Sequence, residues 1–145
     1  MDRRALLTLA PALLAATAAQ AAGGGGEKKK DSSGQHVDLT PMALPVVVGG
    51  RLVNYVFVAL RLNLTSSADA TKLRTKEPWF RDAMVRAGHR SPFTNPKDYT
   101  ILDEAKLKAV LLREAGAIAG AKNFTSVTVT SMTPKQRSGL PRPPG

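Results

Sequence analysis

The sequence predicts an α+β domain in which a small sheet of about three strands carries two or three packed helices. Residues 52–64 alternate between strongly apolar and mixed side chains, which is the pattern of a strand covered on one face by helices. Two later segments repeat apolar residues at helical spacing, and residues 124–132 return to alternation. This order of two strands, helical segments and a final strand favours helices layered on a sheet.

The first two strands are expected to form a hairpin. Residues 46–48 are all valine, and Gly49-Gly50 supplies the positive φ angles that a tight reversal needs. One face of the second strand carries Asn54 together with the apolar residues Leu52, Val56, Val58, Leu60, Leu62 and Leu64. Arg61 is the only charge within this long strand. Its edges therefore need cover, and we expect either the helix around residues 107–118 or a second copy of the protein to provide it.

A helical segment follows this strand, and Ser66 or Ser67 can cap its start. Its apolar positions share one helical face: Leu73, Phe80, Met84 and Ala87. At least one of the two adjacent aromatic residues, Trp79 and Phe80, is expected in the core. Pro78 is expected to kink the helix or to begin a second one, because proline fits a first turn and breaks an interior. Gly88 is expected to end it.

The last third of the domain is expected to contain a loop, a helix and a strand. Residues 89–98 hold two prolines and predict an exposed loop. Thr100 and Asp103 resemble a capping box at the start of the next helix. Its apolar stripe is Leu107, Val110, Leu111, Ala115 and Ile118. Gly120 is a natural stop before the strand at residues 124–132.

Composition divides the chain into four parts. Residues 22–40 are rich in Gly, Lys and Ser and predict a flexible linker, because they hold too little apolar surface to order themselves. Residues 41–133 are the folded domain. The basic, proline-rich residues 134–145 are expected to be a disordered tail. Residues 1–21 form the fourth part, which has the pattern of an export signal.

The export signal is recognised by its charged start and its apolar run. Arg3 and Arg4 precede a run rich in alanine and leucine, and small residues at Ala19, Ala21 and Ala22 fit a cleavage site. The two arginines approach the twin-arginine pattern, with the general secretory route as the alternative. An uncleaved membrane anchor is the competing interpretation. The run of roughly 18 residues is barely long enough to cross a bilayer, and alanine inserts far less well than leucine.

Composition and charge limit the cellular compartments and the classes of partner that fit this chain. The chain has no cysteine, so it can carry neither a disulfide nor the lipid-modified cysteine of a lipoprotein. Cleavage after residue 21 removes two of the 21 basic and one of the 11 acidic side chains, which leaves a net charge of +9. We expect a periplasmic protein without stable membrane insertion that attracts acidic partners. Nucleic acid is not expected, because few aromatic residues accompany the basic ones.

Candidate catalytic residues have simpler structural explanations. His36 and His89 have no second histidine or carboxylate at the spacing of metal ligands. Asp103 and Glu104 open a helix, where the helix dipole favours acidic side chains. The sequence therefore predicts a protein that is not an enzyme and that needs no metal or cofactor.

The domain as a whole has a pattern of lengths and apolar positions that matches a known family. The matching pieces are residues 45–48, 54–64, 77–84, 103–108 and 127–132. With these pieces, residues 41–133 resemble the periplasmic domain of the FliL flagellar basal-body-associated proteins, and Arg81-Asp82 is the most specific element. Proteins of that family carry an uncleaved membrane helix, where this chain is expected to carry a cleavable signal.

The resemblance implies a stomatin-like scaffold domain that forms rings around the flagellar stator. It places Arg81 and Asp82 at the start of a helix, where either Asp82 offsets the helix dipole or the pair bridges protomers. Trp79, with its large aromatic ring, is a further candidate for protein contacts. We therefore expect a homo-oligomeric periplasmic scaffold or assembly protein that contacts envelope machinery such as the flagellar motor. The alternative is a basic binding module for an acidic envelope polymer such as peptidoglycan.

Overall fold

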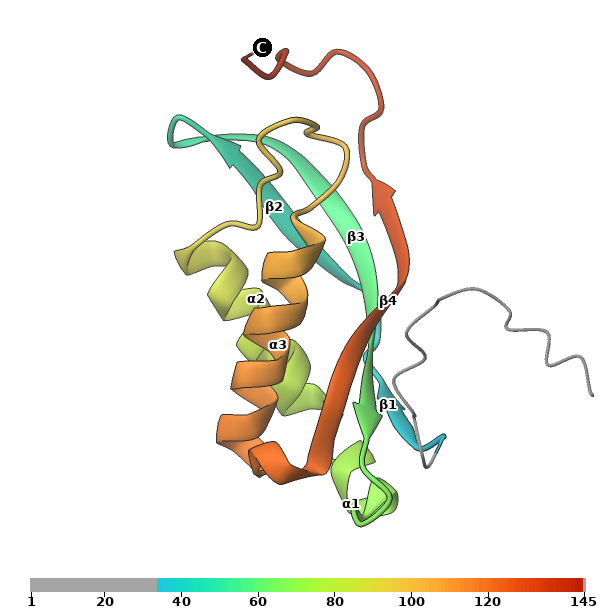
Figure 1. The fold of residues 1–145 in the computed structure, drawn as a ribbon. Helices are drawn as coiled ribbons and strands as arrows, with labels where there is room; N and C mark the ends of the chain where they lie inside the picture. Colours follow the sequence, from blue (N-terminus) through green and yellow to red (C-terminus); the bar gives the residue numbers. More distant parts are fainter. Residues whose placement is uncertain (1–33, 145) are drawn as a thin grey trace, which may run out of the picture.

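The computed structural model describes residues 34–144 and shows an antiparallel sheet of four strands with helices packed on one face (Figure 1). The strands are β1 (His36–Asp38), β2 (Met42–Val48), β3 (Arg51–Leu64) and β4 (Phe124–Pro134). The helices are α1 (Ala70–Arg74), α2 (Glu77–Arg90), α3 (Glu104–Ala119) and the short 3₁₀ helix η1 (Ala121–Asn123). The predicted α+β class is confirmed, and the sheet has one strand more than expected.

Strand β3 lies at the centre of the sheet. Arg61 of β3 pairs with Asp38 of β1 on one side and with Thr128 of β4 on the other. Strand β2 continues the β1 side, since its partners are residues 51–58 of β3. Both edges of β3 are therefore paired with strands of the same chain, β1 and β2 on one side and β4 on the other. The expectation that a helix or a second copy must cover this strand is wrong, because β1 and β4 supply the missing hydrogen-bond partners.

The core lies between the sheet and helices α2 and α3. The even-numbered residues of β3 from Asn54 to Leu64 face the helices and are buried, as the alternation predicted. The predicted stripes of α2 and α3 meet them with the buried residues Phe80, Met84, Ala87, Leu107, Leu111 and Ala115. Leu52 departs from the pattern and is 53% exposed. The β2–β3 register shifts beside it, between Val46 and Val47, and such a bulge redirects side chains.

The hairpin and the proline break are confirmed. Gly49 and Gly50 have φ angles of 57° and 76°, so both adopt the left-handed conformation that a tight hairpin turn requires. Pro78 lies in the first turn of α2, which is separate from α1. The cap of α1 is Asp69 rather than Ser66 or Ser67. No helix within residues 34–144 is long and apolar enough to cross a membrane.

Gly88 has a packing role and does not end α2. The helix continues two residues further, to Arg90, and Gly88 is buried inside it. A Cβ atom at this position would lie 3.0 Å from Cδ2 of Leu44 in β2. The glycine therefore permits the close approach of α2 to the sheet. Gly120 ends α3 as predicted, with a φ of 94°.

The loop after α2 is held against the sheet and is not freely exposed as expected. Thr94 Oγ1 accepts a hydrogen bond from the Val47 N–H at 3.0 Å and donates one to the Val47 carbonyl at 2.9 Å. Phe93 is buried in the core. These contacts satisfy the outward backbone groups of Val47 and fasten the loop to the edge of β2.

The expected linker 22–40 extends too far toward the domain. Its last residues contain β1, which is bonded to β3 and buries Val37 and Leu39. The Leu64 N–H donates to the Gln35 carbonyl at 2.9 Å. Two apolar side chains suffice here because the edge of β3 satisfies the backbone hydrogen bonds. The preceding residues 22–33 lie outside the described part of the chain.

The expected disordered tail 134–145 begins too early for the same reason. Strand β4 includes Pro134, and the Lys135 N–H donates to the Tyr55 carbonyl at 2.8 Å. Gln136 bonds to the side chain of Asn54, and Leu140 packs against the core. The start of the expected tail is therefore fastened to the domain.

Candidate functional site

The three predicted interaction residues lie on α2, but they do not form one cluster. Trp79 is 60% exposed, while the adjacent Phe80 is buried, so the expectation that one of the two belongs to the core is confirmed. Arg81 Nε lies 3.7 Å from Oε1 of Glu77. Arg86 Nη2 lies 3.0 Å from Asp82 Oδ2 as an ion pair within the helix. Arg81 and Asp82 thus have partners within their own helix, and bridging between protomers stays a prediction.

The helix start is also one turn earlier than expected for this pair. Glu77 is the acidic residue of the first turn, and Asp82 is the sixth residue of α2. The Glu77 carboxylate accepts a hydrogen bond from the Thr40 N–H at 2.8 Å and ties α2 to the segment before β2. The predicted export residues Arg3, Arg4, Ala19, Ala21 and Ala22 lie outside the described residues.

A surface that the sequence analysis missed is the outer edge of β4, which we call the β4 edge. Within residues 34–144, β4 pairs with β3 and with no other strand. Its 11 residues contain no ionisable side chain. An uncharged edge strand of this length can pair with another strand, because its outward N–H and C=O groups lack partners. On the opposite side of the sheet, Thr94 bonds to β2 and Pro45 offers no N–H.

The hydrogen bonds of β3 show which residues bond to which side. The Tyr55 carbonyl accepts from Lys135 after β4, whereas the Leu60 carbonyl accepts from Leu39 on the β1 side at 2.9 Å. In an antiparallel ladder, a residue directs its N–H and its C=O to the same side. Odd-numbered residues of β3 therefore bond toward β4, and even-numbered ones toward β1 and β2.

This alternation identifies the free backbone groups of the β4 edge. Thr128 stands opposite Arg61 and so bonds to β3. Its neighbours Val127 and Val129 consequently turn their N–H and C=O groups outward. Neither valine makes a backbone hydrogen bond outside the strand ladder in the described residues. The centre of the β4 edge thus presents two donors and two acceptors.

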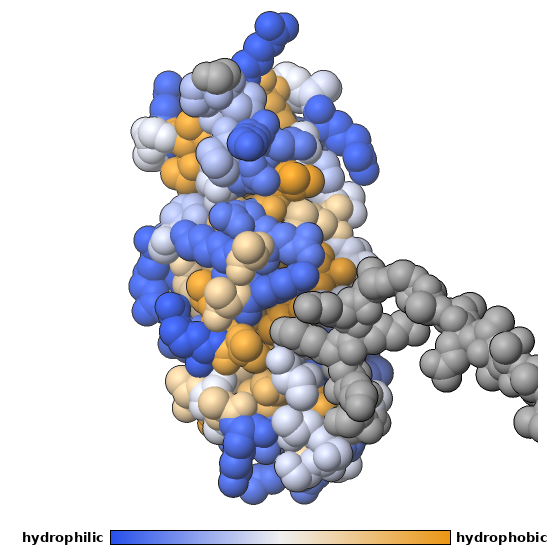
Figure 2. All heavy atoms as spheres, in the orientation of Figure 1, coloured by the Kyte–Doolittle hydropathy of each residue, from blue (hydrophilic) through white to orange (hydrophobic). Residues whose placement is uncertain are grey.

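A groove runs beside the β4 edge on the helix side of the sheet. It has a volume of about 320 Å³, and its walls are Lys108, Ala109 and Leu112 of α3 and Thr125, Ser126 and Val127 of β4. Leu112 is 37% exposed on this surface. Figure 1 shows α3 beside β4, and hydrophobic residues appear in the middle of the same face in Figure 2. The edge and the groove together form a surface suited to an added strand.

The opposite face of the sheet carries an exposed ion-pair cluster. Arg61 Nε donates to Asp38 Oδ1 at 2.6 Å, and His36 Nε2 lies 3.4 Å from Asp38 Oδ2. The hydrogen bond from Arg61 holds the pKa of Asp38 below its usual value. The charged carboxylate helps to join β1 to β3. In the described part of the chain, no group of three His, Cys, Asp or Glu side chains could hold a metal ion.

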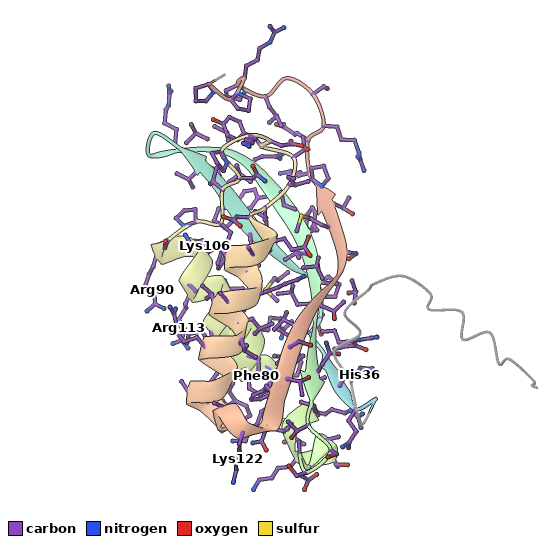
Figure 3. The ribbon with its side chains drawn as sticks, in the orientation of Figure 1. His36, Phe80, Arg90, Lys106, Arg113 and Lys122 are labelled. Carbon is purple, nitrogen blue, oxygen red and sulfur yellow. The ribbon has the colours of Figure 1, made fainter. Side chains whose placement is uncertain are left out.

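Three lysines border a cavity of about 480 Å³ where α1 meets the end of α3. They are Lys72, Lys76 and Lys122, and we call this cavity the lysine pocket. Figure 3 shows Lys122 pointing out at the lower end of the molecule. Lys72 and Lys76 are close in the sequence, whereas Lys122 comes from the distant helix η1, so the sequence gave no sign that all three border one cavity.

No protein-family model matches this chain, and no curated protein matches it. The resemblance to FliL domains stays a prediction made from the sequence.

Proposed function

We propose that this protein is a non-enzymatic periplasmic scaffold that associates with itself through the β4 edge and contacts envelope machinery, as the FliL resemblance implies. The observation that supports the proposal is an uncharged edge strand of 11 residues with outward backbone groups at its centre. Natural edge strands are usually blunted by charge, proline or a covering element. Proline occurs in β4 only at its last residue, Pro134.

The proposed contact is an antiparallel pairing of two β4 strands about a twofold axis at Thr128. The outward groups of Val127 in one copy then bond to those of Val129 in the other. An axis perpendicular to the sheet puts the helices of both copies on the same face, where the exposed Leu112 of each α3 approaches its counterpart. One self-complementary edge closes at a dimer, so a ring would need a second type of contact.

Sedimentation velocity across a micromolar series at physiological salt tests this contact. We expect a dimer, and we expect Thr128→Lys to weaken its dissociation constant about tenfold or more. The two new lysines would lie opposite each other with Cβ atoms about 5 Å apart, where like charges repel. Arg61 beside each of them adds to the repulsion.

Thr71→Lys is the matched control, since it adds the same charge on α1 at an exposed threonine. The control is expected to remain dimeric. A protein that stays monomeric at every concentration, or a dimer that Thr128→Lys leaves intact, would contradict the proposal.

The periplasmic location is part of the proposal and has its own test. Mass spectrometry of periplasmic protein is expected to find Ala22 at the N-terminus. Replacing Arg3 and Arg4 by lysine is expected to block export, because the twin-arginine route reads the guanidinium pair and not charge alone. Undiminished export of that variant would indicate the general secretory route. Recovery of the full-length chain from inner membranes alone would overturn the assignment.

A second candidate function is binding of an acidic envelope polymer such as peptidoglycan. It is favoured by the formal net charge of +10 of the full chain, which attracts acidic polymers at long range. A monomer that binds cell-wall sacculi and releases them at high salt would support this function over the scaffold.

A further inference from the structure

The lysine pocket concentrates positive charge that the protein itself does not neutralise. The side chains of Lys72, Lys76 and Lys122 make no hydrogen bond or ion pair within the described residues. By contrast, the cationic side chains Arg61, Arg81, Arg86, Lys108 and Arg113 each have a carboxylate within 4.0 Å. Other cationic side chains of the described residues, such as Arg51, Arg74 and Lys97, also lack a carboxylate partner. The pocket differs from them because three such cations border one cavity.

The arrangement is electrostatically unfavourable without a ligand. Lys72 of α1 and Lys76 just before α2 line the same cavity as Lys122, so three positive charges are gathered there. Asp69 is the single carboxylate that lines the pocket. Its Oδ1 accepts the Lys72 N–H at 3.0 Å as the cap of α1, so its position is set by the helix. The pocket keeps a formal charge of about +2 from three lysines and one aspartate.

A second basic cavity, between α2 and α3, differs from the lysine pocket because most of its cations have partners within the protein. Arg90, Lys106 and Arg113 line it, and Figure 3 shows Arg90 and Arg113 projecting on the same side. There the Lys106 ammonium donates to Ser91 Oγ at 2.8 Å and lies over the Phe93 ring at 5.5 Å. Arg113 pairs with Glu114. That cavity is smaller, at about 260 Å³, and two of its three cations already have partners.

We propose that the lysine pocket binds a phosphate monoester group. A monoester carries a charge of about −1.5 to −2 at neutral pH, which matches the charge of the pocket, whereas a single carboxylate would leave about half of it uncompensated. Lysine binds phosphate as a mobile point charge from several directions. Ile118, which is partly exposed, also lines the pocket and offers apolar contact to the carbon skeleton of the ligand. This site does not depend on self-association.

Amide chemical shifts during titration with inorganic phosphate test the site, with sodium acetate at equal ionic strength as the comparison. We expect saturable shifts at residues 67–76 and 118–123 with phosphate and none with acetate. Lys122→Gln is expected to weaken binding about tenfold, because each lysine supplies one charge-assisted hydrogen bond. Lys97→Gln removes the same charge from an exposed loop position and is expected to bind normally.

Vesicles of phosphatidylcholine with and without phosphatidic acid identify the source of the phosphate. Binding to the acidic vesicles that inorganic phosphate displaces would indicate a lipid head group. Phosphate binding without vesicle binding would indicate a soluble phosphate ester. Equal shifts with acetate, or phosphate binding that survives Lys122→Gln together with Lys72→Gln, would overturn the proposal.

Discussion

Replacing Phe80 by alanine is expected to lower the free energy of unfolding by about 3–5 kcal/mol, the usual cost of removing a buried aromatic ring. Phe80 is fully buried, and its ring meets that of Phe124 edge to face, with centroids 5.8 Å apart. The contact joins α2 to the first residue of β4. Urea denaturation at neutral pH, followed by circular dichroism, measures the loss.

Trp79→Ala is the matched control because it removes the aromatic ring at the next position. Trp79 is largely exposed, so its replacement is expected to change the free energy of unfolding by no more than about 0.5 kcal/mol. Equal losses for the two variants would contradict the packing described here. A large loss of unfolding free energy for Trp79→Ala but not for Phe80→Ala would mean that α2 packs on the sheet through the face that carries Trp79.

Asn54→Ala is expected to cost about 1–3 kcal/mol, because it leaves buried backbone groups without partners. Asn54 Nδ2 donates to the carbonyls of Tyr99 and Gln136, both at 3.0 Å, and Oδ1 accepts from the N–H groups of Tyr55 and Gln136. One buried side chain thus joins β3, the loop before α3 and the segment after β4. Hydrogen exchange at the Gln136 amide is expected to accelerate along with the loss of stability.

Asn63→Ala is the control on the same strand. Asn63 Nδ2 donates to Ser126 Oγ and Thr128 Oγ1 on the more exposed face of the sheet, where water can replace the lost bonds. Its replacement is expected to cost less than about 1 kcal/mol. If the Gln136 amide exchanged at the same rate in Asn54→Ala as in the unaltered protein, Asn54 would not be what fastens this segment.

The alternation of β3 and the stripes of the helices could be read from the sequence because they follow from local geometry. Side chains alternate across any strand, and every third or fourth residue shares a helix face. The roles of Pro78 and of the Gly49-Gly50 pair could also be predicted from the sequence. Proline fixes its φ angle, and glycine permits the positive φ angles of a tight turn. These rules place each residue within its own element.

Other features depended on which segments meet in space. Strand β1 contains three residues and has no strand signal of its own, so its order comes from the edge of β3. The role of Gly88 was invisible because it depends on the distance to Leu44. The cap of α1 was also decided by geometry, since two serines and Asp69 were all chemically able to supply it.

The sequence by itself determined the α+β class, the long amphipathic strand and the two helical faces. The reason is that strands and helices repeat with different periods, and apolar residues follow the period of the element that they belong to. The tertiary structure decided that β3 is central, that β4 holds the uncharged edge, and that Lys72, Lys76 and Lys122 share one cavity. The physical reason is that hydrogen-bond partners across a sheet and charges around a pocket come from distant segments. The sequence does not show that Lys122 lies beside Lys72 and Lys76, or that β1 and β4 lie on either side of β3.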